Sequence, residues 1–216
     1  MGELDGKVAI VTGAGRLRGI GRAAAVELAR LGADVVVTGT GRDPDTFPPD
    51  EKAVDWKDVE SVAEQIRSHG RRALTFTVDV TNPDHVDNMV EATIQQFGRI
   101  DILINNAAFA RGVDRVPILE LDENIFQKVM DIKVTGTFLC TKAVLKHLVA
   151  QGQGGKIVNI SSTAGKRGSA NTLAYNAANF AIVGMTQSMA RELGHFGINV
   201  NAVCPGAVDT HRMDIL

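Results

Sequence analysis

Residues 12–21, TGAGRLRGIG, are rich in glycine and connect two different patterns. An apolar run at residues 8–11 precedes them, and the periodicity of a helix follows them. Glycines in such a turn let the backbone approach a pyrophosphate, and the free N–H groups of the helix start attract its charge. Gly13, Gly19 and Gly21 stand where this role needs them. The segment predicts a nucleotide site, with an ordinary flexible loop as the alternative.

A glycine-rich turn of this kind has to be held by a sheet, and the rest of the chain predicts one. Apolar runs alternate with helical patterns, which indicates a doubly wound parallel α/β sheet of the Rossmann type, with strand order 3-2-1-4-5-6. The expected strands are residues 7–12, 34–38, 73–78, 100–104, 156–160 and 198–203. The expected helices are residues 21–31, 54–69, 83–97, 122–150 and 174–193. Gly32, Gly70, Gly98 and Gly194 follow four of these helices, where a C-terminal cap belongs.

One irregular insertion, residues 39–52, follows the second expected strand and is rich in proline and aspartate. The ribose of a bound adenosine would lie at the end of this strand. The insertion is therefore expected to fold over a cofactor or, as the alternative, to form a solvated loop.

Length and charge limit the classes of protein to consider. The 216 residues predict a single domain, residues 1–216, and the net charge of −2 without a long basic run gives no support for nucleic-acid or membrane binding. Cys140 and Cys204 lie far apart in apolar segments, as reduced core residues of a cytoplasmic protein do. The five histidines lack the spacing of metal ligands, so we expect no metal site. The sequence begins without the pattern of a signal peptide.

Several motifs at the expected strand ends resemble, in order and spacing, those of the short-chain dehydrogenase/reductase family. The glycine turn is similar to that family's T-G-x-x-x-G-x-G, with two extra residues. Asp79 and Val80 end the third strand, Asn105 to Ala108 are similar to the family's N-N-A-G, and residues 205–210 look like its P-G-x-x-x-T. The resemblance implies hydride transfer between NAD(P) and a small carbonyl or alcohol substrate. The residues expected to bind the cofactor are Gly13, Arg18, Gly19, Ile20, Gly21, Arg42, Asp79, Val80, Asn106, Ala107, Tyr175, Pro205, Gly206, Val208 and Thr210.

Reduction of a carbonyl by hydride needs a proton donor and a second hydrogen bond at the carbonyl oxygen. Ser162 follows the fifth expected strand, and Tyr175, the only tyrosine, comes thirteen positions later, as is usual in the family. The resemblance implies that Tyr175 is the catalytic acid/base and that Ser162 orients the substrate oxygen. The structural alternatives are a serine that caps a helix and a tyrosine in the core.

Two polar residues of the family's catalytic tetrad are exchanged in this chain. The family lysine, four residues after the tyrosine, is Asn179, and the family asparagine, in the preceding long helix, is Lys133. The lysine would contact the nicotinamide ribose and favour the ionised tyrosine. The exchange suggests that Lys133 supplies the cation and Asn179 the amide. The alternative is that Lys133 is an unrelated helix lysine and the site is weakened.

The choice between NADP and NAD depends on the end of the second strand. An acid there would bind the ribose 2′-hydroxyl of NAD, but the residue is Gly39. Arg18 resembles the basic residue of NADP-preferring members, and Arg42 could join it on a 2′-phosphate. We therefore predict NADP, with NAD as the alternative because Asp43 and Asp45 are near.

The two long helices, residues 122–150 and 174–193, resemble those that form the family's dimer interface. Their apolar residues exceed what one sheet face needs, so a homodimer or homotetramer is expected; examples are Phe138, Leu139, Phe180 and Val183. The chain ends six residues after Thr210, whereas family members continue with a seventh strand. The sixth strand would then be an uncovered edge, so we expect a truncated form or a covering partner. The substrate is not predicted, because the missing part largely sets it in this family.

Three functions compete. The first is an NADP-dependent alcohol dehydrogenase or ketone reductase, which the spacing of Ser162 and Tyr175 favours. The second is a catalytically weak or silent dinucleotide-binding sensor or assembly subunit, which Asn179 favours. The third, a nucleotide-sugar epimerase, has little support because the chain leaves no room for a sugar domain.

Overall fold

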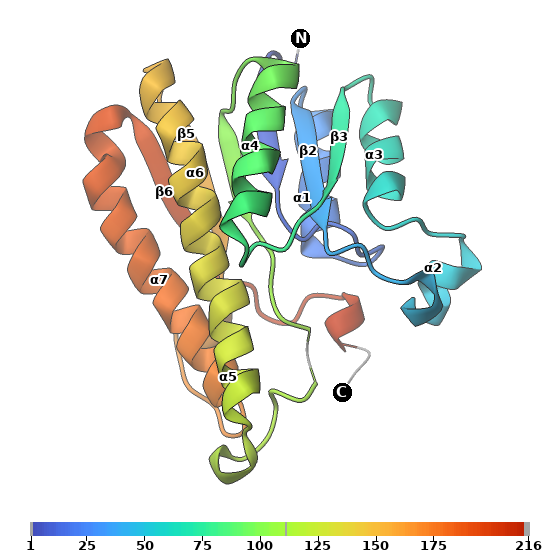
Figure 1. Ribbon diagram of the computed structural model, residues 1–216, viewed down its shortest axis with the longest axis vertical. Helices are drawn as coiled ribbons and strands as arrows, with labels where there is room; N and C mark the ends of the chain where they lie inside the picture. Colours follow the sequence, from blue (N-terminus) through green and yellow to red (C-terminus); the bar gives the residue numbers. More distant parts are fainter. Residues whose placement is uncertain (1, 111, 214–216) are drawn as a thin grey trace.

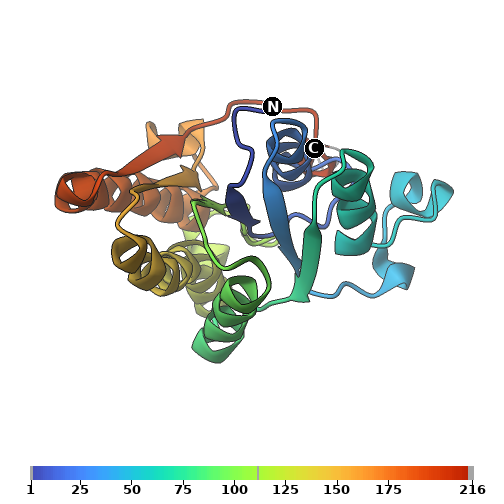
Figure 2. The ribbon, with the colours of Figure 1, turned by 90° about the horizontal axis from the view of Figure 1, so that it is seen from above.

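A six-stranded parallel sheet lies between two layers of helices in the computed structural model, which describes residues 2–110 and 112–213 (Figures 1 and 2). The strand order is β3-β2-β1-β4-β5-β6, which confirms the predicted doubly wound topology. The strands are β1 (Val8–Val11), β2 (Asp34–Gly39), β3 (Ala73–Thr77), β4 (Ile102–Asn105), β5 (Gly155–Ile160) and β6 (Ile198–Val203).

The helices follow the predicted order with two local differences. They are α1 (Ile20–Arg30), α2 (Pro49–Ala53), α3 (Val59–Ser68), α4 (Pro83–Phe97), α5 (Glu123–Met130), α6 (Gly136–Gln151) and α7 (Leu173–Leu193). The helix expected at 54–69 begins only at Val59, because Asp55 and Asp58 have φ angles of 49° and 53° that no helix accepts. The insertion expected to be irregular contains the short helix α2.

Two further expectations about helices need correction. The segment expected as one helix at 122–150 is α5, a wide π-helical turn at Asp131–Thr135, and α6. Gly194 is not a left-handed cap: its φ is −58°, and a 3-10 turn carries the chain on to Gly197, whose φ is 71°. Gly32, Gly70 and Gly98 have the positive φ values that the sequence predicts.

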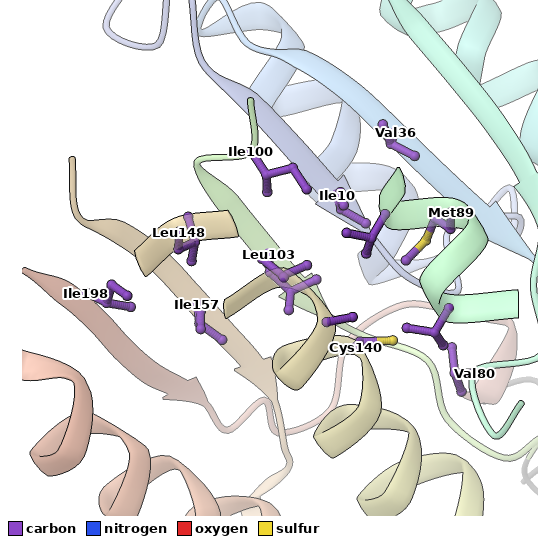
Figure 3. Close-up of a cluster of buried hydrophobic side chains, with 14 of the residues drawn as sticks. Ile10, Val36, Val80, Met89, Ile100, Leu103, Cys140, Leu148, Ile157 and Ile198 are labelled. Carbon is purple, nitrogen blue, oxygen red and sulfur yellow. The ribbon is translucent and has the colours of Figure 1, made fainter. Parts of the chain in front are cut away.

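Both faces of the central strands are buried. On one face a continuous row crosses the sheet through paired residues, Val36, Ile10, Leu103, Ile157 and Val200, under α4, α6 and α7 (Figure 3). The other face packs on α1 and α3. Each buried aliphatic side chain stabilises the fold by about 1.5–3 kcal/mol, so this row fixes the register that brings all strand ends to one edge.

The sixth strand is the edge of the sheet, as the sequence predicts. Ile198 and Val200 are buried against α7, whereas Asn199 and Asn201 are exposed on the other face. Within the residues that the structure describes, no helix combines the length and apolar character needed to cross a membrane.

The two cysteines are free thiols. Cys140 belongs to the core, and burial raises the pKa of its thiol to about 12, so it stays protonated at neutral pH. Cys204 is only half-buried.

Candidate active site

A cavity of about 640 Å³ opens where the chain leaves the carboxyl ends of the strands. Its walls include the glycine turn, the ends of β3, β4 and β5, the start of α7 and the segment after β6. All fifteen residues predicted to bind the cofactor line it, as do Ser162, Lys133 and Asn179. The fold therefore brings together motifs that lie up to 197 positions apart, from Gly13 to Thr210. Such a crevice beside the point where strand order reverses is where doubly wound sheets bind ligands.

The glycine turn is built together with the end of β4. Gly13 has a φ of 65°, and a Cβ there would lie 2.8 Å from the Cα of Ala107. A Cβ on Gly21 would lie 2.5 Å from Nδ2 of Asn106, which donates to the carbonyls of Thr12 and Gly13 at 2.9 and 2.8 Å. These glycines let the turn pack tightly on β4, and the Asn106 side chain braces its carbonyls.

Gly19 immediately precedes α1 and offers the best test of the phosphate cradle. Its φ of −139° suits any residue, and an added Cβ would lie 3.1 Å from the Arg16 Cβ and 3.2 Å from the Arg16 carbonyl oxygen, a tight fit that a small shift at Arg16 relieves. A Gly19→Val variant should therefore fold, but its side chain should block the first N–H groups of α1 from an anion. We expect dinucleotide affinity to fall about a hundredfold in a fluorescence titration. This is the effect of losing two charge-assisted hydrogen bonds to the phosphates. Unchanged affinity in a folded variant would mean that the phosphates bind elsewhere.

Ser162 and Tyr175 both face the cavity. Ser162 is buried at the end of β5, and its Oγ accepts a hydrogen bond of 3.1 Å from the N–H of Ala164. It therefore caps a short 3-10 turn, as one structural alternative suggests, and its hydroxyl hydrogen is still able to donate. Tyr175 is half-buried in the first turn of α7.

Lys133 lies in the π-helical turn, where such distortions often mark functional sites. Its side chain is buried, and Nζ donates to the carbonyl of Ile160 at 2.5 Å, beside the strand end that carries Ser162. Lys133, Tyr175 and Asn179 also share a second, small cavity of about 10 Å³. The exchanged pair and the tyrosine therefore line the same small cavity.

Asn179 carries an acceptor without a partner. It is 1% exposed, and its Nδ2 donates to the Tyr175 carbonyl at 2.8 Å. Its Oδ1 is buried and has no hydrogen-bond partner among the residues that the structure describes. A buried acceptor of this kind is costly unless a ligand supplies a donor, so Asn179 fits a hydroxyl-rich cofactor.

Arg115 is a cavity residue that the sequence analysis missed. Its guanidinium carbon lies 3.9 Å from the centre of the Tyr175 ring, and its Nε lies 3.2 Å from a carboxylate oxygen of buried Asp114. The guanidinium therefore makes a cation–π contact with the tyrosine ring. No motif marks Arg115, because it lies in a long connection between β4 and α5 whose path the sequence does not reveal.

The insertion after β2 does not form a simple solvated loop. Glu51 of α2 is 1% exposed and accepts from the N–H of Leu17, while the Trp56 indole donates to the Gly15 carbonyl at 2.7 Å. The insertion and the segment that follows it, which holds Trp56, therefore brace the glycine turn from outside. In the described part of the chain, His, Cys, Asp and Glu side chains form no group of three that could hold a metal ion.

Comparison with known proteins agrees with this geometry. The model of the family "short chain dehydrogenase" matches residues 7–215. The chain is 42% identical to the short chain dehydrogenase/reductase astE of Aspergillus oryzae over 96% of this chain and 73% of that protein. It is 38% identical to a 3-oxoacyl-[acyl-carrier-protein] reductase of Synechocystis over 100% of this chain and 80% of that one.

Solved structures give the same result. Carveol dehydrogenase from Mycobacterium avium in complex with NAD has a TM-score of 0.86 and 33% identity, over 99% of this chain and 75% of that chain. The glycine turn, the serine–tyrosine spacing, the strand order and these comparisons agree, and the chain belongs to the short-chain dehydrogenase/reductase family.

Proposed function

We propose that this protein transfers a hydride between a nicotinamide dinucleotide and a small carbonyl or alcohol substrate, with Tyr175 as acid/base and Ser162 as the orienting residue. One observation carries the proposal: Ser162 and Tyr175 line the same cavity as the glycine turn. One cavity therefore contains the glycine turn, which would bind the phosphates, and the hydroxyls of Ser162 and Tyr175, which would contact a carbonyl oxygen.

The chemistry of the chain's own residues follows from their positions. When bound, the nicotinamide would donate the hydride to the carbonyl carbon or accept it from the alcohol. In the reduction, the Tyr175 hydroxyl gives its proton to the carbonyl oxygen, and the Ser162 hydroxyl donates a hydrogen bond to the same oxygen. In the oxidation, the Tyr175 phenolate takes the alcohol proton.

The cation beside Tyr175 comes, in this proposal, from Lys133 in place of the family lysine. Support comes from the cavity that Lys133, Tyr175 and Asn179 share, and from the buried position of the ammonium. The Oδ1 of Asn179, which has no hydrogen-bond partner among the described residues, would accept from a ribose hydroxyl. Arg115 adds a second positive charge, 3.9 Å from the centre of the tyrosine ring.

A catalytically silent dinucleotide sensor is the second candidate, because asparagine stands where the family has its lysine. Both candidates bind the dinucleotide, so only turnover separates them. The test is a fluorescence titration with NADH and NADPH, followed by a turnover assay on a panel of ketones and aldehydes. Binding with turnover supports the enzyme, and saturable binding without turnover of any carbonyl supports the sensor.

For the choice of cofactor we propose NAD, the alternative, rather than NADP as the sequence predicts. Arg42 is paired with Glu51 and Asp58, and Arg18 with Asp50 and Asp209, so both arginines have carboxylate partners. Support also comes from similar proteins solved with NAD, the carveol dehydrogenase and a xylitol dehydrogenase that is 33% identical.

Association into a homodimer or homotetramer is also proposed. Phe138 on α6 and Phe180 on α7 are 50% and 46% exposed, whereas Leu139, expected among the surplus residues, packs against the core. We expect a dimer or larger species in sedimentation velocity at micromolar concentration, and monomers for Phe138→Glu with Phe180→Glu, because burying a charge opposes association. A monomeric wild type would contradict this expectation.

A further inference from the structure

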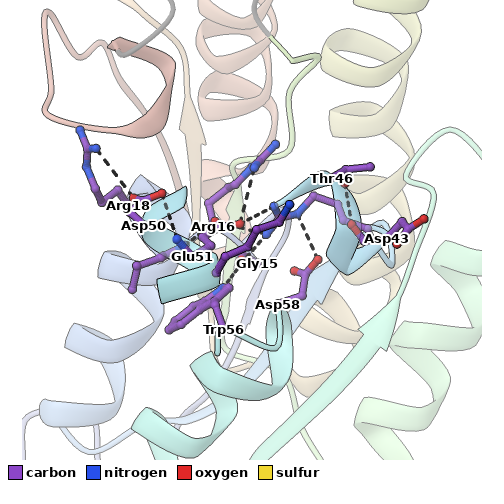
Figure 4. Close-up of polar contacts among 12 residues, drawn as sticks. Gly15, Arg16, Arg18, Asp43, Thr46, Asp50, Glu51, Trp56 and Asp58 are labelled. Carbon is purple, nitrogen blue, oxygen red and sulfur yellow. Dashed lines mark hydrogen bonds and ion pairs between the residues drawn. The ribbon is translucent and has the colours of Figure 1, made fainter. Parts of the chain in front are cut away.

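The end of β2 lacks a side chain, and another residue fills its place. A Cβ built on Gly39 would lie 2.9 Å from Oδ1 of Asp58 and 3.0 Å from a methyl group of Val59. A Cβ on Gly15 would overlap the same Asp58 oxygen. Glycine at these two positions therefore leaves room for one carboxylate, which reaches the strand end from the segment between α2 and α3 (Figure 4).

Asp58 is held in an unusual conformation at this place. Its φ of 53° and ψ of −127° lie in a region that favours glycine, so the backbone is strained there. The residue is 8% exposed and lines the cavity. Its Oδ1 is buried and has no hydrogen-bond partner among the described residues. The Asp58 carboxylate can therefore accept a further hydrogen bond beside the cavity. The strained backbone and the unpaired oxygen both destabilise the folded protein unless a ligand donates to that oxygen.

Arg42 holds this carboxylate in position. Its Nε donates to Asp58 Oδ2 at 3.1 Å, its Nη1 to Glu51 at 2.7 Å, and its Nη2 to the Gly15 carbonyl at 3.0 Å. Figure 4 labels Asp58, Glu51 and Gly15, the three partners of this guanidinium. All three nitrogens of Arg42 are engaged within the protein, so the residue acts as a brace for Asp58 rather than as a ligand for a 2′-phosphate.

We propose that Asp58 replaces the acid missing at the end of β2: its carboxylate accepts a hydrogen bond from the adenosine ribose 2′-hydroxyl of NAD(H) and repels the 2′-phosphate of NADP(H). The proposal rests on the proposed function, since it assigns a specificity-determining residue to the same dinucleotide site. It also accounts for glycine at position 39, since a side chain there would meet the Asp58 carboxylate.

The chain supplies its own probe for binding. Trp56 is its only tryptophan, and its indole donates to the carbonyl of Gly15, at the turn where Asp58 lies. Quenching of Trp56 fluorescence by NADH and NADPH therefore measures the two dissociation constants without any turnover. We expect the wild type to bind NADH at least tenfold more tightly than NADPH, since a buried charge pairs with a hydroxyl but repels a phosphate.

Asp58→Asn removes the charge and keeps the shape, and asparagine tolerates a positive φ as well as aspartate does. We expect NADH binding to weaken about tenfold and NADPH binding to tighten. Asp55→Asn is the matched control: it makes the same change in the same segment, at a φ of 49° and with a 94% exposed side chain. It should leave both dissociation constants unchanged.

A rescue variant separates a lost contact from damage to the fold. Asp58→Gly with Gly39→Asp moves the carboxylate to β2 and relieves the positive φ, so NADH preference should return relative to Asp58→Gly alone. Wild type that prefers NADPH, or an Asp58→Asn variant that behaves like Asp55→Asn, would overturn the role of Asp58 while leaving the dinucleotide site intact. Wild type that binds neither nucleotide would overturn the proposed function itself.

Discussion

Tyr175→Phe should reduce turnover at least a thousandfold while the protein still binds its dinucleotide. The substitution removes only the hydroxyl that would exchange a proton with the substrate oxygen, and general acid–base catalysis contributes about 10²–10⁴ in rate. The ring stays, so its contact with Arg115, 3.9 Å from the ring centre, is kept. Steady-state kcat and a nucleotide titration on the same sample measure the two effects.

Ser162→Ala is the companion variant for this experiment. It loses the orienting hydrogen bond and also the bond from the Ala164 N–H, so kcat should fall about a hundredfold or more. Retention of most activity in Tyr175→Phe would show that another group handles the proton and that the tyrosine has only a packing role.

The second large effect concerns Lys133. Lys133→Met keeps the buried aliphatic stem and removes the ammonium that donates to Ile160. If this charge stabilises the Tyr175 phenolate, turnover should fall about a hundredfold to a thousandfold, and the remaining activity should appear only at higher pH. Lys128→Met, at an exposed lysine of α5, is the control. It should change neither the turnover nor its pH dependence.

The exchange can be reversed in the protein. Lys133→Asn with Asn179→Lys should rescue turnover relative to Lys133→Asn alone, because the cation returns to the helix position that the family uses. Asn179→Lys alone should gain little, since two cations would then share one small cavity with Tyr175. A strong gain from Asn179→Lys alone, with no loss in Lys133→Met, would mean that the exchange is a coincidence and the site is a weakened one.

The sheet could be predicted because its strands are buried on both faces. Val36, Ile10, Leu103 and Ile157 form one row in the core, and strands that carry such rows read as continuous apolar runs. The strand at residues 198–203 matches the prediction at both ends. The cavity lining could also be predicted, because parallel strands bring their carboxyl ends to one edge whatever the loops do.

The features that could not be predicted from the sequence depend on local backbone geometry and on contacts between side chains of different elements. The π-helical turn at Lys133 looks like ordinary helix in the sequence, because apolar periodicity hardly changes over one widened turn. From the sequence, Arg42 is predicted to bind a 2′-phosphate. In the structure its guanidinium forms ion pairs with Glu51 and Asp58. Asp58 itself is nineteen positions from Gly39, and only the fold shows that its carboxylate fills the space beside that glycine.

Hydride transfer can be measured directly with NADH that carries deuterium on the nicotinamide C4 as the source. The protein, this deuterated NADH and a panel of ketones and aldehydes are incubated, and the alcohols are analysed by mass spectrometry. We expect one deuterium at the carbinol carbon of at least one product, and none with Tyr175→Phe. Saturable NADH binding with no deuterium in any alcohol would contradict the assignment of Ser162 and Tyr175 as a catalytic pair.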